Sequence, residues 1–180
     1  MDVEPKTGLP PSLPRIGLQL ILPEGFENVM WYGRGPHENY WDRKEGAQIG
    51  VYSMTVDDLY VPYIKPQENG NRTDVRWVSF TNSSGIGLLF VGMPLMEFSA
   101  HHYTTEDFEK AKHTHELKRR KDITLNIDYR QSGLGGGSCG PDTLPKYLVK
   151  PKHTHFSVRL KPISSIESAM ELSKQRIKEK

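Results

Sequence analysis

Alternating apolar and polar positions run through much of the chain and predict β-strands. In residues 16–22, Ile16, Leu18, Leu20 and Leu22 occupy every second position. Because successive side chains of a strand point to opposite faces, this period of two predicts a half-buried strand. Similar alternation, or a short apolar run between turn residues, predicts further strands at 26–32, 49–56, 74–80, 86–91, 95–102, 122–129 and 155–160.

One helical segment is predicted among these strands. Thr104 and Asp107 have the spacing of a capping box, in which each side chain bonds to the backbone of the other residue. Phe108, Ala111 and His115 then fall on one face of a helix. We therefore expect an all-β antiparallel fold with one short helix.

Three regions are expected along the 180 residues. Residues 1–14 carry four prolines and no periodicity, so 1–12 are expected to be a linker or an artificial end of the chain. Residues 13–163 are expected to form one β-sandwich domain, which is long enough to bury a real core. Residues 164–180 place Ile166 and Met170 on one helical face, which predicts a helical or frayed tail.

Composition narrows the functional classes. The net charge is +2 and charged residues make up 26% of the chain, so neither nucleic acid nor a membrane surface is an expected partner. No apolar run is long enough to cross a bilayer. The single cysteine, Cys139, excludes an intrachain disulfide and suits a reducing compartment.

Two stretches, Trp31–Arg43 and Tyr60–Trp77, concentrate aromatic rings, acids and arginines. One interpretation is a pair of buried turns in which carboxylates pair with arginines. The other is a binding site for a polar ring, since flat aromatic faces and forked hydrogen-bonding groups suit such a ligand. The residues that would form this site are Trp31, Glu38, Tyr40, Trp41, Arg43, Glu68 and Arg72.

These stretches resemble the C-terminal region of family 2 glycoside hydrolases that are β-galactosidases. The family pattern includes Leu-Pro-Arg-Ile-Gly, Gly-x-Gly-Pro-x-Glu-Asn-Tyr-x-Asp-Arg and Pro-Tyr-x-x-Pro-x-Glu-Asn-Gly-x-Arg. These motifs occur here in the same order, followed by Leu-Asn-Ile-Asp and a glycine-rich loop, at residues 13–17, 33–43, 62–72, 125–128 and 133–141. The resemblance covers about residues 13–162 and implies a β-supersandwich similar to the galactose mutarotase fold, of which this chain would be a partial copy.

The resemblance also implies where the chemistry lies. Glycoside hydrolysis needs two carboxylates across the scissile bond, and composition alone offers Glu38, Asp42, Glu68 and Asp74. In the family, however, the catalytic glutamates belong to a separate barrel domain, which also commonly binds Mg²⁺ and Na⁺. We therefore expect no catalytic residue and no cofactor in this chain, and no activity from it alone.

One loop of this domain is expected to reach the barrel's active site. The family pattern there is Gly-Gly, a few small or acidic residues, Ser-Trp and then Pro, with the tryptophan near the sugar. The matching positions include Ser138 and Cys139, so the chain has a thiol where the family has an indole. Either the smaller side chain opens the pocket to bulkier acceptors, or the loop is flexible and its cysteine incidental.

The histidines form two pairs with the same sequence, His113-Thr114-His115 and His153-Thr154-His155. Four imidazoles together could bind a divalent ion. Without cysteines or spaced carboxylates, structural or solvent-facing roles are favoured, and no metal site is assigned.

Three functions follow as hypotheses. The favoured one is the C-terminal β-sandwich of a β-galactosidase that hydrolyses terminal β-D-galactosides, with the barrel domain or large subunit as partner. A carbohydrate-binding module and a mutarotase-like aldose epimerase are the alternatives. Open sheet edges favour a homo-oligomer, and the expected location is the cytoplasm, with the periplasm as alternative.

Overall fold

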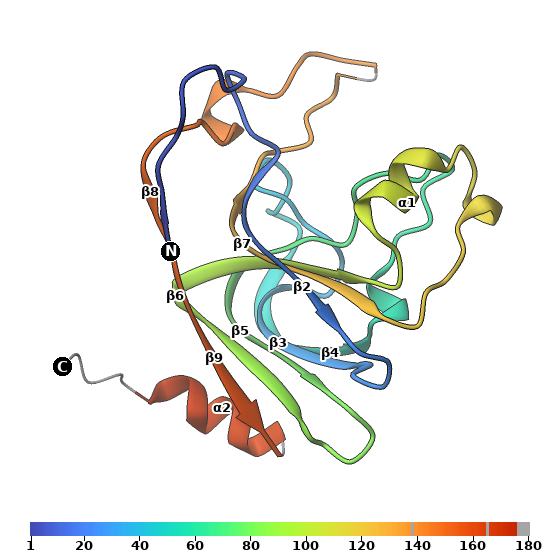
Figure 1. Cartoon of the computed structure of the whole chain (residues 1–180), viewed down its shortest axis with the longest axis vertical. Coiled ribbons are helices and arrows are strands. Elements are labelled where there is room, and N and C mark those ends of the chain that lie inside the picture. The colour runs from blue at the N-terminus through green and yellow to red at the C-terminus, as the bar shows by residue number, and fades with distance from the viewer. Residues whose placement is uncertain (138, 165, 176–180) are drawn as a thin grey trace.

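The computed structural model describes residues 1–137, 139–164 and 166–175. Antiparallel strands dominate it, so the all-β prediction is confirmed (Figure 1). The strands are β1 (Asp2–Val3), β2 (Arg15–Leu22), β3 (Asn28–Gly35), β4 (Gln48–Thr55), β5 (Arg72–Thr81), β6 (Gly87–His101), β7 (Ile123–Gln131), β8 (Thr154–His155) and β9 (Ser157–Ile163). The helices are α1 (Thr105–Lys110) and α2 (Ile166–Lys174), with 3-10 turns at Asp57–Leu59, Thr114–Glu116 and Pro145–Tyr147.

A seven-stranded sheet organises the chain in the order β2-β7-β6-β5-β3-β4, and β9 also pairs with β6. The long strand β6 serves two partners on one side. Its residues Gly87–Met93 pair with β9, whereas Glu97–His101 pair with β7. The first half of β6 therefore pairs with β9 and its second half with β7, so that β7 and β9 follow one another along the same edge of β6.

The main core lies where inward faces of β3, β5, β6 and β7 meet. The predicted strand is confirmed as β7, and its apolar side chains Ile123, Leu125 and Ile127 are fully buried on one face, although Thr124, Asn126 and Asp128 on the other face are buried as well. The three apolar side chains join residues of the other strands in one cluster, which includes Val29, Trp31, Val78, Phe80, Phe90 and Phe98. A smaller cluster on the opposite side packs α2 against the sheet through Trp77, Leu89, Val91, Ile163 and Ala169.

Both α-helices lie in segments where the sequence predicts helix, although α1 is shorter than expected. Thr104 caps α1, and its hydroxyl accepts the Asp107 N–H while the Asp107 carboxylate accepts the Thr104 N–H. The helix ends before Ala111, so His115 lies in the following 3-10 turn and not on the helix as expected. The second helix, α2, lies in the segment expected to be helical or frayed. None of the described helices has the length and apolar character needed to span a membrane.

The first residues of the chain pair with residues 154–156 beside the sheet. Strand β1 pairs antiparallel with β8, and the Met1 ammonium group donates to the Phe156 carbonyl at 2.8 Å. Phe156 is buried between β8 and β9, so the single strand expected over 155–160 is divided there.

Candidate functional site: the loop cluster

Three loops meet at one end of the sheet, and we call them the loop cluster: residues 36–47, 57–71 and 132–147. Glu38 joins the first two. Its carboxylate accepts hydrogen bonds from Arg43 at 2.5 Å, from the Tyr63 hydroxyl and from the Gly70 N–H at 2.7 Å. Three donors of the protein thus bind this carboxylate, and its side chain is only 8% exposed.

Arg72 joins the same two loops from inside. Its guanidinium donates to the carbonyls of Leu59, Gly70 and Pro36 at 3.2, 2.7 and 3.0 Å, and lies over the Trp31 ring. Burial lowers the pKa of Arg72 to about 10, so the guanidinium remains charged at neutral pH. Trp31 is 0% exposed and Arg72 is 2% exposed. Their burial favours a structural role over contact with a ligand.

The remaining candidate acids are also held by cations or by the backbone. Asp74 forms ion pairs with Arg34 at 2.7 Å and with Lys44 at 2.9 Å. Glu68 forms an ion pair with Arg15 at 2.6 Å. These contacts match the interpretation in which carboxylates pair with arginines.

Asp42 anchors the glycine-rich loop, which was predicted separately at 133–141. Its carboxylate accepts the N–H groups of Leu134 and Gly135 at 3.2 and 2.7 Å. A side chain at Gly133 would meet the Asp42 carboxyl carbon at 2.5 Å, so this close approach requires glycine. Sequence reasoning considered Asp42 only as a candidate acid and missed its role as an anchor, because the contact joins positions 92 and 93 residues apart.

Beyond this anchor the glycine-rich loop projects from the upper end of the molecule (Figure 1). Gly135 has a positive φ of 63°, and residues 134–137 and 139–142 are exposed. Cys139 is exposed near the tip, and its N–H donates to the Gly136 carbonyl at 3.0 Å. Ser138, the other loop position expected near a sugar, lies outside the described residues.

Trp41 forms the base of this loop. Its ring N–H donates to the Lys146 carbonyl at 3.1 Å, and the Tyr147 ring packs edge-on against it. The Arg130 guanidinium carbon lies 3.7 Å and the Lys44 ammonium 4.3 Å from the centre of the indole. Two cations at these distances from one aromatic ring stabilise the base of the loop.

A cleft of about 700 Å³ opens beside the loop cluster. Forked polar groups and apolar side chains share its walls, namely Arg15, Gln67, Glu68, Phe108, Gln131 and Leu134. Of the residues predicted to bind a polar ring, only Glu68 lines this cleft; the others form the interior or the rim of the loops.

Two buried acids behind the cleft were missed by sequence reasoning. Asp128 lies 3.3 Å from Arg15, and Glu97 lies 3.5 Å from Arg130. Burial raises the pKa of each carboxyl to about 7, although the arginines oppose this shift. The available signal was an acid inside an otherwise apolar strand segment, as at Glu97 in 95–102.

Comparison with known proteins agrees with the motifs. Residues 1–160 match the family model described as beta galactosidase small chain. The chain is 39% identical over 155 residues to a beta-galactosidase of Priestia megaterium, covering 85% of this chain and 15% of that protein. The chain is also 40% identical over 152 residues to a beta-galactosidase of Vibrio cholerae, and this match covers 84% of this chain and 14% of that protein. To a beta-galactosidase of Pseudoalteromonas haloplanktis the chain is 39% identical over 162 residues, which covers 89% of this chain and 15% of that protein. The chain therefore spans about one seventh of the length of these relatives.

Proposed function

The chain belongs to the beta galactosidase small chain family, and we propose that it is the non-catalytic C-terminal β-sandwich of a family 2 β-galactosidase. The whole enzyme would hydrolyse terminal β-D-galactosides in its barrel domain or large subunit. The Mg²⁺ and Na⁺ ions that the resemblance implies would bind there. This chain would support the barrel and extend its glycine-rich loop to the active-site pocket.

The observation that carries this proposal is that groups of the chain itself bind the carboxylates of all four candidate acids. A glycosidase needs one carboxylic acid to protonate the leaving group and one carboxylate, in reach of the same bond. Glu38, Asp42, Glu68 and Asp74 each bind an arginine, a lysine or backbone N–H groups of the chain. Such contacts occupy the carboxylate oxygens that a substrate would need, which supports a non-catalytic role.

The glycine-rich loop supports the second part of the proposal. It is pinned at its base by Asp42 and Trp41, and exposed beyond it. A loop with a fixed base and an exposed end is suited to complete a site on a neighbouring domain. With Cys139 in place of the indole of the family pattern, that site would have more room beside the sugar.

The proposed partners and location follow from the same premise. The barrel domain would be the first partner and a second copy of the enzyme another, as a homo-oligomer. We propose a cytoplasmic location, with the periplasm as the alternative.

The test uses the β-galactosidase that contains this chain, with Asp42→Ala as the informative variant. Loss of the anchor frees Leu134 and Gly135, so the loop should lose its fixed position while the core stays intact. We expect kcat/KM for a nitrophenyl β-galactoside to fall roughly tenfold, about 1.4 kcal/mol of transition-state stabilisation. The melting temperature should change little.

The control is Glu45→Ala, which removes an exposed acid three positions away. It should leave both quantities unchanged. The 180-residue chain assayed alone should be silent, and robust turnover by it would contradict the non-catalytic role. Unchanged kinetics in Asp42→Ala would contradict the role of the loop.

The cleft favours a second candidate function, carbohydrate binding by the chain itself. Arg15, Gln67, Glu68 and Gln131 offer planar groups that suit the hydroxyls of a sugar, and the volume of about 700 Å³ would hold one. Binding of methyl β-galactoside by the chain without turnover, weakened by Gln67→Ala, would favour this function.

A further inference from the structure

The connection between α1 and β7 carries a compact group of histidines and an acid. Its 3-10 turn, Thr114–Glu116, is closed by hydrogen bonds from the Glu116 N–H to the His113 carbonyl at 3.1 Å and from the Leu117 N–H to the Thr114 carbonyl at 3.2 Å. The turn therefore fixes the backbone that bears both imidazoles and the carboxylate.

The rest of the connection is fastened to the fold on the far side of the turn. The Arg120 N–H donates to the His102 carbonyl at 2.9 Å, and the Arg120 guanidinium donates to both carboxylate oxygens of Asp107 at 2.6 and 2.9 Å. Asp107 itself belongs to the capping box of α1. The turn is thus an exposed feature on an anchored segment.

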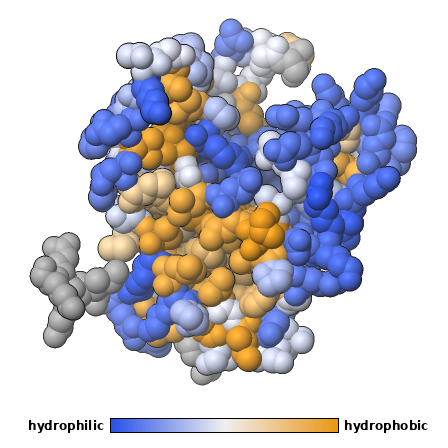
Figure 2. All heavy atoms as spheres, in the orientation of Figure 1, coloured by the Kyte–Doolittle hydropathy of each residue, from blue (hydrophilic) through white to orange (hydrophobic). Residues whose placement is uncertain are grey.

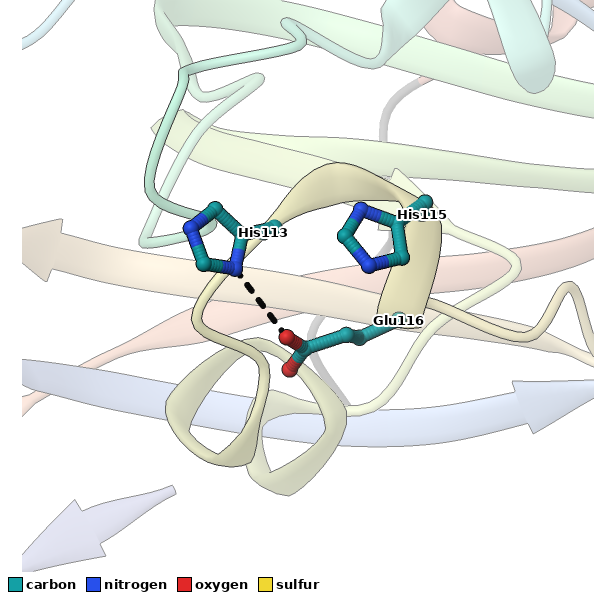
Figure 3. A group of neighbouring side chains, drawn as sticks. All are labelled: His113, His115 and Glu116. Carbon is teal, nitrogen blue, oxygen red and sulfur yellow. Dashed lines mark hydrogen bonds and ion pairs between the residues drawn. The ribbon is translucent and has the colours of Figure 1, made fainter.

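Three potential metal ligands converge on one side of this turn (Figure 3). Ligand atoms of His113, His115 and Glu116 all lie within 4.8 Å of one another. The two imidazoles stack with centroids 5.5 Å apart and an interplanar angle of 15°, and His113 Nδ1 lies 3.1 Å from Glu116 Oε1. The other carboxylate oxygen accepts the Lys112 N–H at 2.9 Å, so the carboxylate is oriented before any ion arrives.

We propose that His113, His115 and Glu116 form a binding site for a divalent ion of the Zn²⁺ type. Two imidazoles and one carboxylate are a zinc ligand set that leaves a fourth position for water. Ligands around tetrahedral zinc, with bonds of about 2.0–2.1 Å, lie roughly 3.4 Å apart. The three ligand atoms now lie within 4.8 Å of one another, and the exposure of the side chains leaves room for the rotations that would bring them to that spacing.

Neighbouring charges set the expected selectivity. Lys110 and Lys118 line a hollow of about 260 Å³ together with Glu116 and Asp107. Because Asp107 is already paired with Arg120, the two lysine charges oppose a bound cation. An ion that binds mainly by charge, such as Mg²⁺, is therefore disfavoured. Ions that form strong bonds to imidazole, such as Zn²⁺, Ni²⁺ and Cu²⁺, are favoured.

The chain contains its own comparison, because the tripeptide His-Thr-His occurs twice. In the second copy, His155 Nδ1 lies 2.8 Å from Asp2 Oδ1 and Nε2 lies 3.1 Å from Ser157 Oγ. Both ring nitrogens of His155 are thus engaged with other groups. His153 lies 3.4 Å from Glu4, on the surface beside β1. In this second His-Thr-His copy the two imidazoles therefore contact different groups and do not converge as His113 and His115 do.

The experiment titrates the 180-residue chain, prepared without a histidine tag and stripped of metal, with Co²⁺ and then Zn²⁺. We expect one Co²⁺ per chain with the visible absorption of a tetrahedral site, displaced by Zn²⁺. His115→Gln and Glu116→Gln should each weaken binding by tenfold or more. The double variant His153→Gln/His155→Gln should bind as the original chain does.

Two results would overturn the proposal. One is the absence of saturable Co²⁺ or Zn²⁺ binding by the original chain. The other is equal loss of affinity in the His153→Gln/His155→Gln variant, which would point to adventitious binding by surface imidazoles. The substituted side chains are exposed, and circular dichroism of each variant shows whether it is folded.

Discussion

Glu97 shows how a single buried acid affects the stability of this sheet. It is 2% exposed on β6, and its carboxylate accepts hydrogen bonds from the Asn71 amide and the Gln131 N–H, each at 3.1 Å. These two donors and Arg130 favour the ionised form, yet burial outweighs them and raises the pKa to about 7. On the adjacent strand β7, burial raises the pKa of Asp128 as well, and the charge of Glu97 adds to that shift.

This shift predicts a pH dependence of stability that Glu97→Gln should remove. With a folded-state pKa of about 7 and an ordinary value of 4.5, the folded chain holds a proton that the unfolded chain has lost. This group therefore lowers the free energy of unfolding as the pH rises from about 4.5 to about 7. The free energy of unfolding of Glu97→Gln, relative to that of the original chain, should therefore rise by roughly 2 kcal/mol between pH 5 and pH 8.

Urea unfolding at both pH values measures this difference. The exposed α1 residue Glu109 provides a matched control, since Glu109→Gln removes the same charge at the surface. Its difference from the original chain should not change with pH. A Glu97→Gln difference that is equally flat would mean that the carboxyl is ionised in the folded state throughout.

At the scale of elements, the sequence pattern predicted those features that depend on residues close together in the chain, such as a strand or a helix cap. The alternation in residues 16–22 and 122–129 predicted β2 and β7, and two residues three apart predicted the cap of α1. Contacts made by the whole sheet could not be read in this way. On β4, Ile49 and Val51 face outward and are 45% and 47% exposed, whereas Tyr52 on the alternate face packs against the core.

The capping box gives a prediction at this scale. Because α1 has only six residues, its unpaired N–H groups are a large share of its backbone, and Thr104 satisfies one of them. Thr104→Ala should lower the free energy of unfolding by about 1 kcal/mol.

Thermal unfolding of the chain measures this effect, and Thr105→Ala is the matched control. Thr105 is the exposed first residue of α1 and lies outside the cap. A similar loss in both variants would attribute the effect to helix propensity and not to the cap.

At the scale of the whole molecule, the motifs identified the family but not the way in which their loops meet. The sequence identified the two aromatic stretches and the glycine-rich loop as distinct segments of the chain. It contained no sign that Asp42 would bind Gly135 or that Arg72 would lie over Trp31, because such contacts depend on how the sheet curls. The ion pairs of the loop cluster were foreseen only as one of two interpretations.

The curled sheet also leaves apolar surface uncovered. The centre of Figure 2 shows hydrophobic residues over β2 and β9. On β2, Leu18 is 39% exposed on the face that the sequence predicts to be buried, and Ile21 is 58% exposed on the opposite face. Leu160 on β9 is 51% exposed. Within the described residues β2 is the end of the sheet and pairs only with β7. An apolar strand with one open edge is a template for association with another chain.

We therefore expect the isolated chain to self-associate through β2, and Ile21→Lys to weaken that association. A lysine on an edge strand must lose its hydration when a second strand pairs there, which opposes pairing. Light scattering after gel filtration, over a range of concentrations, should show the original chain moving from monomer to larger species and Ile21→Lys remaining monomeric. Ile64→Lys makes the same substitution at a loop residue that is 90% exposed, so it controls for the added charge. If both variants suppress association equally, net charge and not the edge of β2 governs it; if neither does, the association surface lies elsewhere on the sheet.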